Sequence, residues 1–499
     1  MTSEADVVVV GAGFAGLLVA RALLAAGRTV LMLERGFFKP HAAQLGDGHH
    51  EVPSAATEHT HEPEPGDAAY PWNYVQGVGG GSLHWTGAAP RLLPSDFALR
   101  SEHGVGRDWP LGYRDLEPFY VEAERILRVA GGELPWFPSS APLPQPAHPP
   151  SPADRVAEAA LGAFGPLPQA RPSVAAAGRP ACCSNTNCAL CPVDARASML
   201  HLLEDEGMLE HPRLELRTGT VVARLRPAGS RVGEIECVDA NGEATRVAAG
   251  TVVLAAGGFE NPAIILRSGL EEPDVGRWLF DHGHRLVHVE LDRPAGSAHG
   301  ATHITGGSWA YADGPRRASE GSLLVLVLNQ GILGSRSIRD AILAGRLGAA
   351  GREELRRRVE HTLVLDVVGE DLPQRGRRVE LSGARDRLGL PRTRVVYAGD
   401  SPYLERARGR LVADLERRFA GQGGRVVAVE RAGEGSHQLG TCFMGDGDGV
   451  VDRDLRHHRL DNLFVVGGSA FPAYSAHHPT LTICALALRL GAELVAESS

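Results

Sequence analysis

The chain has 499 residues, of which 43% are hydrophobic and 22% are charged, and its length favours two joined domains over a single core. Its 60 acidic and 51 basic side chains give a net charge of −9, which argues against nucleic acid or an anionic membrane as a partner. The sequence contains no run of about 20 apolar residues, so no membrane span is expected. Acidic residues before the first apolar run argue against a signal peptide. We therefore expect a cytoplasmic protein.

The start of the chain has the pattern of a dinucleotide-binding unit. The apolar run at residues 7–10 predicts a buried parallel strand, residues 17–26 predict a helix, and residues 29–33 predict a second strand. Between the first strand and the helix stand three glycines with the spacing GxGxxG: Gly11, Gly13 and Gly16. The first permits a tight turn, the second lets backbone approach a diphosphate, and the third lets helix and strand pack. Because Glu34 ends the second strand, where it can hold a ribose hydroxyl, we expect an adenine dinucleotide here.

A second glycine-rich stretch spans residues 74–97. It contains three consecutive glycines: Gly79, Gly80 and Gly81. Such a run brings bare backbone against a flat or charged ligand. Ser82, His84 and Trp85 follow directly, and the alternative interpretation is a glycine-rich turn beside a core tryptophan.

This second stretch resembles the first signature of the glucose–methanol–choline (GMC) oxidoreductases, in which the loop runs along the isoalloxazine and pyrophosphate of FAD. The resemblance recurs in order along the chain. Residues 251–270 are similar to the second signature of the family, and residues 437–445 and 461–488 are similar to its catalytic end. The resemblance therefore implies that the dinucleotide is FAD.

Three further segments extend the resemblance. Residues 214–225 look like the family's strand that contacts adenine, with Val222 at the contact. Residues 276–284 match the segment that closes the first portion of the FAD domain, and residues 377–397 are similar to a substrate-domain hairpin and its exit strand. The resemblance also assigns cofactor contacts to five other residues: Arg35, Gly257, Gly468, Pro479 and Thr480.

The fold implied by this resemblance is α/β, with a Rossmann-like FAD-binding domain and a second α+β substrate domain built on an antiparallel sheet. Residues 1–130, 200–285 and 430–499 are expected to form the discontinuous FAD-binding domain. Residues 131–199 and 286–429 are expected to form the substrate domain and its cap.

Two patterns belong to the expected substrate domain. Alternating apolar runs between residues 284 and 430 predict the antiparallel sheet. Residues 136–154 are too rich in proline for a helix or an inner strand. A similar segment in the sugar-oxidising branch of the family borders the active-site entrance, and a stiff linker is the alternative.

Oxidation of an alcohol by a flavin needs a base for the hydroxyl proton, and an imidazole with a pKa of about 6.5 suits this task. The family pattern places one histidine before the GTC-like turn, here His437, and a second before PTLT, here His478. We expect His437 to take the proton and His478 to hold the same oxygen. His477 is the alternative for the second position, but the following Pro479-Thr480 pair favours His478.

Two residues relate the chain to the sugar-oxidising branch. Gly467 replaces the aspartate of the usual VVDAS motif. The order GSLHWT resembles the pyranose oxidase stretch whose histidine, here His84, is bonded covalently to the flavin. Most relatives with His-Trp at this place lack that bond, so the sequence favours dissociable FAD and keeps covalent attachment as the alternative.

Four cysteines cluster in ACCSNTNCALCP: Cys182, Cys183, Cys188 and Cys191. Thiolates at short spacing followed by proline are typical of iron–sulfur or zinc ligation, and the segment resembles the cluster-bearing glucose dehydrogenases. The last gap has two residues where three are expected, and two of the cysteines are adjacent. An iron–sulfur cluster, a zinc ion, and a metal-free loop or local disulfide therefore all stay open.

The sequence thus predicts an FAD-dependent dehydrogenase or oxidase that acts on an alcohol of a sugar-like molecule. The sugar-oxidising branch that the chain resembles includes enzymes that oxidise the 6′-hydroxymethyl of aminoglycoside precursors. An acidic chain suits such a polycationic substrate, so the resemblance makes this position the specific expectation. A redox-neutral hydroxynitrile lyase of the same fold and a non-catalytic flavin-binding subunit are the alternatives. The electron acceptor is expected to be oxygen, a quinone or a cytochrome partner.

Overall fold

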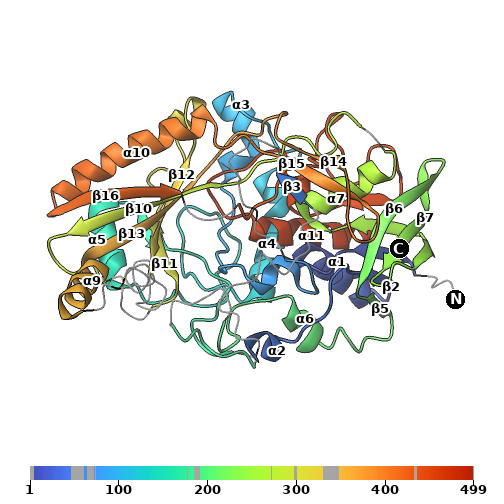
Figure 1. Cartoon of the computed structure of the whole chain (residues 1–499), viewed down its shortest axis with the longest axis horizontal. Helices are drawn as coiled ribbons and strands as arrows, with labels where there is room; N and C mark the ends of the chain where they lie inside the picture. Colours follow the sequence, from blue (N-terminus) through green and yellow to red (C-terminus); the bar gives the residue numbers. More distant parts are fainter. Residues whose placement is uncertain are drawn as a thin grey trace.

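The computed structural model describes residues 5–46, 61–63, 72, 75–176, 178–184, 191–270, 272–296, 301–329, 345, 348–431 and 435–497. Two sheets with different topologies dominate this part of the chain, and they lie toward opposite ends of the long axis (Figure 1). No helix within the described ranges is both long enough and apolar enough to cross a membrane.

A five-stranded parallel sheet has the order β17-β9-β1-β2-β5. Its strands are β1 (Val7–Val10), β2 (Val30–Leu33), β5 (Leu214–Arg217), β9 (Thr251–Leu254) and β17 (Leu463–Val465). The three inner strands are apolar along almost their whole length because helices or loops cover both faces of a parallel sheet. The sheet gathers segments from the start, the middle and the end of the chain. This confirms the predicted Rossmann-like unit.

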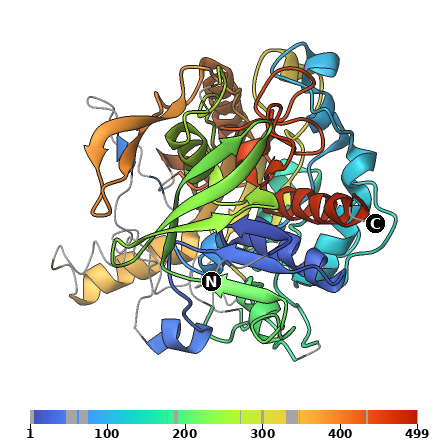
Figure 2. The same ribbon diagram turned by 90° about the vertical axis from the view of Figure 1, so that its right-hand side faces the viewer.

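Helix α1 (Phe14–Ala25) follows β1 directly, with Gly13 as its N-cap, so it begins three residues earlier than residue 17. It packs against α11 (Thr480–Ala496), where a Cβ on Gly491 would lie 2.7 Å from the Cβ of Ala22. Only glycine permits this approach of the two helices. Figure 2 shows the red C-terminal helix beside the blue N-terminal segment.

The prediction of one strand over residues 214–225 is wrong. Gly219 has φ +62° and turns the chain between β5 and β6 (Thr220–Ala228), which belong to different sheets. Strand β6 forms an antiparallel sheet with β7 (Arg231–Asp239) and β8 (Ala244–Ala248). A glycine in the left-handed region ends a strand because other residues rarely adopt that conformation.

The second large sheet is antiparallel and has the order β16-β10-β13-β12-β11-β4. Its strands are β4 (Phe164–Pro166), β10 (Gly283–Leu291), β11 (Ile304–Ser308), β12 (Leu323–Leu328), β13 (Thr362–Gly369) and β16 (Gly424–Arg431). The predicted antiparallel sheet is therefore present. One face packs on α5 (Pro152–Leu161) and α10 (Pro402–Ala420), and the other faces the loops that follow the parallel sheet.

Helix α5 corrects the end of the proline-rich segment. The helix starts at Pro152, and its N-cap Ser151 accepts a hydrogen bond from the backbone N–H of Asp154. Proline is compatible with the first helical turn because its missing N–H would have no intrahelical partner there. The segment is therefore irregular only up to Ser151.

The hairpin of β14 (Arg378–Arg385) and β15 (Pro391–Val396), together with β3 (His61–Pro63), forms a small third sheet. It packs on α7 (Gly257–Arg267), where Val379 and Tyr397 meet Phe259. The other α-helices within the described residues are α2 (His41–Gly46), α3 (Leu99–His103), α4 (Tyr113–Leu127), α6 (Leu200–Glu204) and α9 (Ala349–His361).

Candidate active site

A cavity of about 460 Å³ runs from the carboxyl ends of β1, β2 and β9 to the edge of the antiparallel sheet. Ligands of open α/β sheets bind at this end of the strands. The predicted site residues that line the cavity are Gly11, Gly13, Glu34, Arg35, Gly80, Gly81, His84, Trp85, Val222, Gly257, His437, Gly468, His478, Pro479 and Thr480. The structure therefore brings together residues that are more than 400 positions apart in the sequence.

The two glycine-rich loops meet with bare backbone. Gly11 has φ +99°, and a Cβ there would lie 2.6 Å from the carbonyl oxygen of Ala255. Gly80 has φ +49°, and a Cβ there would lie 3.1 Å from the Cα of Gly13. The backbone N–H of Gly79 donates to the carbonyl of Ala12 (2.7 Å), which locks one loop on the other. Such a cradle accommodates a flat or charged group close to the main chain.

Three predicted contacts lie behind the wall of the cavity. Gly16 packs α1 on β1, since a Cβ there would overlap the carbonyl oxygen of Gly11. Gly79 makes the backbone bond described above and does not line the cavity. The Ser82 hydroxyl donates to the carbonyl of Gly79 (2.7 Å) and accepts from the backbone N–H of Met199 (2.9 Å). We therefore assign Gly79 and Ser82 to loop structure instead of direct contact.

Glu34 ties both loops to the end of β2. One of its carboxylate oxygens accepts from the backbone N–H of Ala12 (2.9 Å), and the other accepts from those of Gly36 (2.8 Å) and Gly77 (3.2 Å). A carboxylate has about four acceptor positions. Glu34 thus keeps capacity for a ribose hydroxyl while it fixes the shape of the loops.

The arginine next to it, Arg35, is held in an ion-pair network at the same end of the cavity. Its guanidinium lies 2.9 Å from Glu260 and 3.3 Å from Asp386. Val222 and Ile264 add an apolar wall near by. A polar rim with an apolar wall is suited to a nucleoside, so the residues present fit the dinucleotide expected from the sequence.

At the other end of the cavity lie the two predicted catalytic histidines, with ring centroids 5.8 Å apart. His437 is fixed through its backbone N–H, which donates to Asp281 (3.0 Å). His478 stands two residues before α11. His477, the alternative, does not line the cavity: its Nδ1 lies 3.0 Å from the hydroxyl of Ser475. Of these two neighbouring histidines, His478 is the one that lines the cavity.

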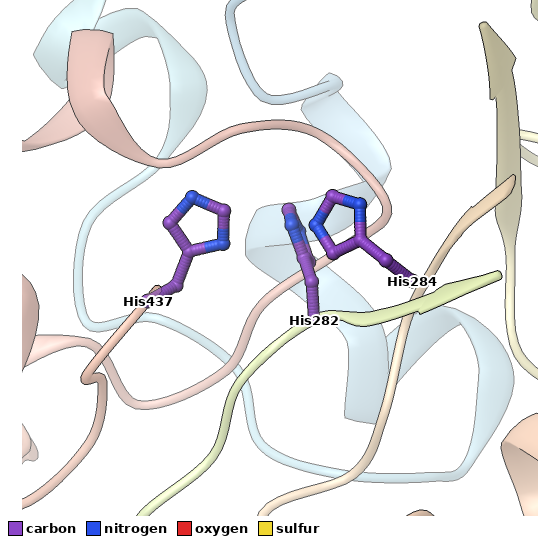
Figure 3. A group of neighbouring side chains, drawn as sticks. All are labelled: His282, His284 and His437. Atoms are coloured by element: carbon purple, nitrogen blue, oxygen red, sulfur yellow. The ribbon is translucent and has the colours of Figure 1, made fainter. Parts of the chain in front are cut away.

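Two further histidines, His282 and His284, were not predicted as site residues. His282 directly precedes β10 and His284 is its second residue, and both rings lie near His437 (Figure 3). The ring of His282 lies 4.6 Å from that of His437, and the ring of His284 lies 6.0 Å from that of His478. The signal in the sequence was the spacing HGH entering a strand, because residues two apart in a strand point to the same face.

Burial determines the protonation of the predicted pair. Burial, reinforced by the nearby His284, lowers the pKa of His478 to about 3. Burial, followed by the charges of His478 and His284, lowers the pKa of His437 well below its ordinary value. Both rings are therefore neutral near neutral pH, and each offers one nitrogen lone pair.

The arrangement of His282, His284 and His437 also requires a test for metal binding, since their potential ligand atoms lie within 4.8 Å of one another. His282 has both nitrogens engaged. Its Nε2 lies 3.0 Å from the carbonyl oxygen of Ser475, which can only accept, so Nε2 carries the proton. Its Nδ1 therefore accepts from the Tyr474 hydroxyl (3.2 Å). A metal ion would have to break one of these bonds, and we assign His282 to structure.

The described residues give no support to metal binding by the cysteine cluster. Cys182 and Cys191 are free thiols, and Cys188 lies outside those residues. Within the described ranges, no group of three potential ligands close enough for one ion includes a cysteine. The buried thiol of Cys191 instead accepts from the backbone N–H of Ala195 (3.2 Å).

The glycine cradle, the acid at the end of β2 and the two neutral imidazoles define a flavin-dependent oxidoreductase. Residues 6–84 match a family model described as an FAD binding domain, and residues 156–284 and 373–487 match models described as GMC oxidoreductase. The chain belongs to the GMC oxidoreductase family. It is an FAD-dependent alcohol oxidoreductase.

The chain is similar over nearly its whole length to characterised members of this family. It is 30% identical to the fructose dehydrogenase large subunit of Gluconobacter japonicus, over 98% of this chain and 97% of that one. It is 32% identical to paromamine 6'-oxidase of Streptomyces fradiae, over 97% of this chain and 90% of that one. The crystal structure of pyridoxine 4-oxidase from Mesorbium loti shares the fold, with a TM-score of 0.67, 22% identity and 98% and 99% of the two chains covered.

Proposed function

We propose that this protein oxidises an alcohol of a sugar-like substrate, and that the 6′-hydroxymethyl group of an aminoglycoside precursor is the position attacked. The observation that carries the proposal is the pair of neutral imidazoles, His437 and His478, facing the same cavity as the glycine cradle. The relatives named fructose dehydrogenase and paromamine 6'-oxidase support the class of substrate.

FAD, when bound, supplies the acceptor for the hydride that leaves the alcohol carbon. The protein supplies orientation and proton transfer. The Nδ1 of His437 lies 3.5 Å from the carboxylate of Asp281, which favours the proton on Nδ1 and leaves Nε2 with its lone pair. Nε2 then takes the hydroxyl proton. The loss of a proton and a hydride converts the alcohol into a carbonyl compound.

His478 holds the reacting oxygen. Its Nδ1 is buried without a hydrogen-bond partner among the described residues, and its ring lies across the cavity from His437. A neutral imidazole has one donor and one acceptor, so His478 can donate to the substrate oxygen while His437 accepts from it.

The charge of the protein supports a cationic substrate. The net charge is −9, and a polycationic pseudosugar would be drawn to such a chain. Aminoglycoside precursors combine several positive charges with sugar-like hydroxyl groups. Neutral sugars share only the hydroxyl groups, so the two classes make different predictions for the dependence of binding on salt.

The test is anaerobic mixing of the FAD-loaded protein with paromamine, fructose and a simple alcohol such as 2-propanol. The proposal predicts that paromamine bleaches the flavin band, that the product carries an aldehyde at C6′, and that added salt raises the KM for paromamine more than for fructose. A band that none of the three bleaches would favour the lyase or non-catalytic alternatives. Bleaching by fructose alone would contradict the aminoglycoside assignment.

A further inference from the structure

His284 and Asp366 form a buried pair on neighbouring strands of the antiparallel sheet. In the register of β10 and β13, His284 is opposite Val368 and Leu286 is opposite Asp366, so the pair is diagonal. The Nδ1 of His284 lies 3.0 Å and 3.2 Å from the two carboxylate oxygens of Asp366. The pair thus joins two adjacent strands directly at the edge of the cavity.

The surroundings of Asp366 indicate that the pair has a purpose other than packing. Asp366 is 8% exposed, and the residues two before and two after it in β13, Val364 and Val368, belong to an apolar cluster. A buried carboxylate costs free energy unless it is paired, and an apolar residue at this position would avoid that cost. The carboxylate therefore serves His284.

The contact with Asp366 engages only one of the two ring nitrogens of His284. Because Nδ1 is engaged with Asp366, Nε2 is the remaining polar atom, and His284 lines the cavity together with His437 and His478. The ring centroid of His284 lies 6.1 Å from that of His437 and 6.0 Å from that of His478. Three imidazoles thus surround the place where the proposed function puts the reacting oxygen.

We propose that His284, oriented by Asp366, is a third catalytic residue that donates a hydrogen bond from Nε2 to the substrate oxygen and stabilises the negative charge that develops there. This inference rests on the proposed function. As His437 removes the hydroxyl proton, charge builds up on the oxygen before the hydride leaves. A donor aimed at that oxygen lowers the barrier, as donors of an oxyanion hole do.

The charge of the pair supports this role. Burial alone would lower the pKa of His284, but the charge and hydrogen bond of Asp366 outweigh burial and raise this pKa above its ordinary value. The carboxylate of Asp281 also raises it, and the Arg408 guanidinium, itself paired with Asp400 (2.6 Å), lowers it. The other titratable groups around the ring are His282, His437 and His478. The pKa of His284 is thus raised while those of His437 and His478 are lowered, so His284 keeps its second ring proton to a higher pH than its two neighbours do.

The test measures the rate of flavin reduction in the full-length, FAD-loaded protein as a function of pH. In the wild type, the rate should fall as the pH rises through the raised pKa of His284, because the donor loses its charge. Asp366→Asn should move this alkaline limb toward lower pH, and each unit of that shift lowers the rate on the limb by up to tenfold. His284→Gln should lower the rate about 10²- to 10³-fold and abolish the limb.

Two controls separate catalysis from folding. Glu430→Gln removes a carboxylate 3.9 Å from His288, another imidazole of β10 that does not line the cavity, and should leave the limb in place. His284→Gln leaves a buried carboxylate without its partner, so the double variant with Asp366→Asn keeps the test valid if the single variant does not fold. The flavin absorbance of each variant reports folding, and ¹⁵N histidine NMR of the wild type and of Asp366→Asn reports the pKa of His284 independently of activity.

The outcomes are distinct. An Asp366→Asn variant that retains the wild-type alkaline limb, or an unchanged pKa of His284 in NMR, overturns this inference alone. A wild-type protein whose flavin no alcohol reduces overturns the proposed function, and this inference falls with it.

Discussion

His437 can act as a base because its surroundings keep it neutral and its backbone is held by Asp281. The sequence predicted both His437 and His478, since each stands at a fixed place in a family motif. It did not predict His284, because the partner that gives this residue its charge, Asp366, is 82 positions away. The register that joins them depends on how two strands pair, and no local pattern specifies it.

Replacing His437 with asparagine should slow flavin reduction about 10²- to 10⁴-fold, because the hydroxyl proton loses its acceptor. In the wild type the rate should rise as the pH rises through the lowered pKa of His437, so the protein should keep its activity below about pH 6.5. Rapid mixing under anaerobic conditions measures both quantities. His458→Gln, a change at an exposed histidine outside the cavity, is the control, and an equal loss in both variants would refute the assignment.

Gly80→Ala should weaken FAD retention about tenfold or more. The residue has φ +49°, a conformation that costs a side chain about 1–2 kcal/mol, and the new Cβ would press on Gly13 across the cradle. Gly104→Ala is the matched control, since Gly104 has φ +75° with open space around it and does not line the cavity. The flavin-to-protein absorbance ratio after gel filtration reports the outcome. Equal ratios for the two variants would mean that the cradle does not hold the cofactor.

At the scale of elements, the sequence predicted those whose pattern is local and failed where a single residue changes the direction of the chain. Strand β1, helix α1 and strand β2 follow from an apolar run, glycines and a second apolar run. The division of residues 214–225 into β5 and β6 depends on the conformation of Gly219, which the apolar pattern does not reveal.

Helix α10 offers a test at this scale. Gly409 lies on its exposed side, its backbone is helical, and a Cβ there would meet nothing within 4 Å. Gly409→Ala should therefore raise the free energy of unfolding by about 0.5–1 kcal/mol. The reciprocal change Ala413→Gly, also exposed on α10, should lower it by a similar amount, as thermal unfolding can measure. Changes of the same sign in both variants would contradict the packing of this helix.

At the scale of the whole molecule, the site exists only where the two large sheets meet. The parallel sheet contributes the cradle, β10 and β13 contribute the His284 pair, and the segment before α11 contributes His478. The family resemblance predicted that these parts belong together. The distances between these parts could not be predicted from the sequence, because the cavity is formed by loops from opposite ends of the chain.

Acid should destabilise the whole protein from about pH 6.5 downward. Burial lowers the pKa of His478 to about 3 and those of His84 and His457 to about 4, so the unfolded chain binds their protons before the folded protein does. Stability therefore rises with pH in this window, by about 1.4 kcal/mol per unit for each such histidine. His284 has a raised pKa, so its contribution to stability changes with pH in the opposite direction: this contribution is lost as the pH rises above about 6.5.

Thermal unfolding between about pH 5 and 7 measures this slope. His457 lies outside the cavity. Because His457→Asn removes one of the buried histidines, it should reduce the slope of stability against pH by about one proton. A melting temperature that does not change over this range would show that the folded protein binds as many protons as the unfolded chain, so that the pKa values of these rings are not lowered.

The most direct test of the central claim, transfer of a hydride from an alcohol carbon beside His437 and His478, is a single-turnover isotope experiment. Paromamine carrying deuterium at C6′ is mixed anaerobically with the FAD-loaded protein, and the rate of flavin bleaching is compared with that of unlabelled paromamine. The account predicts slower bleaching with the deuterated substrate and a deuterated aldehyde as product. Equal rates with no product at C6′, in a protein whose flavin is otherwise reducible, would contradict it.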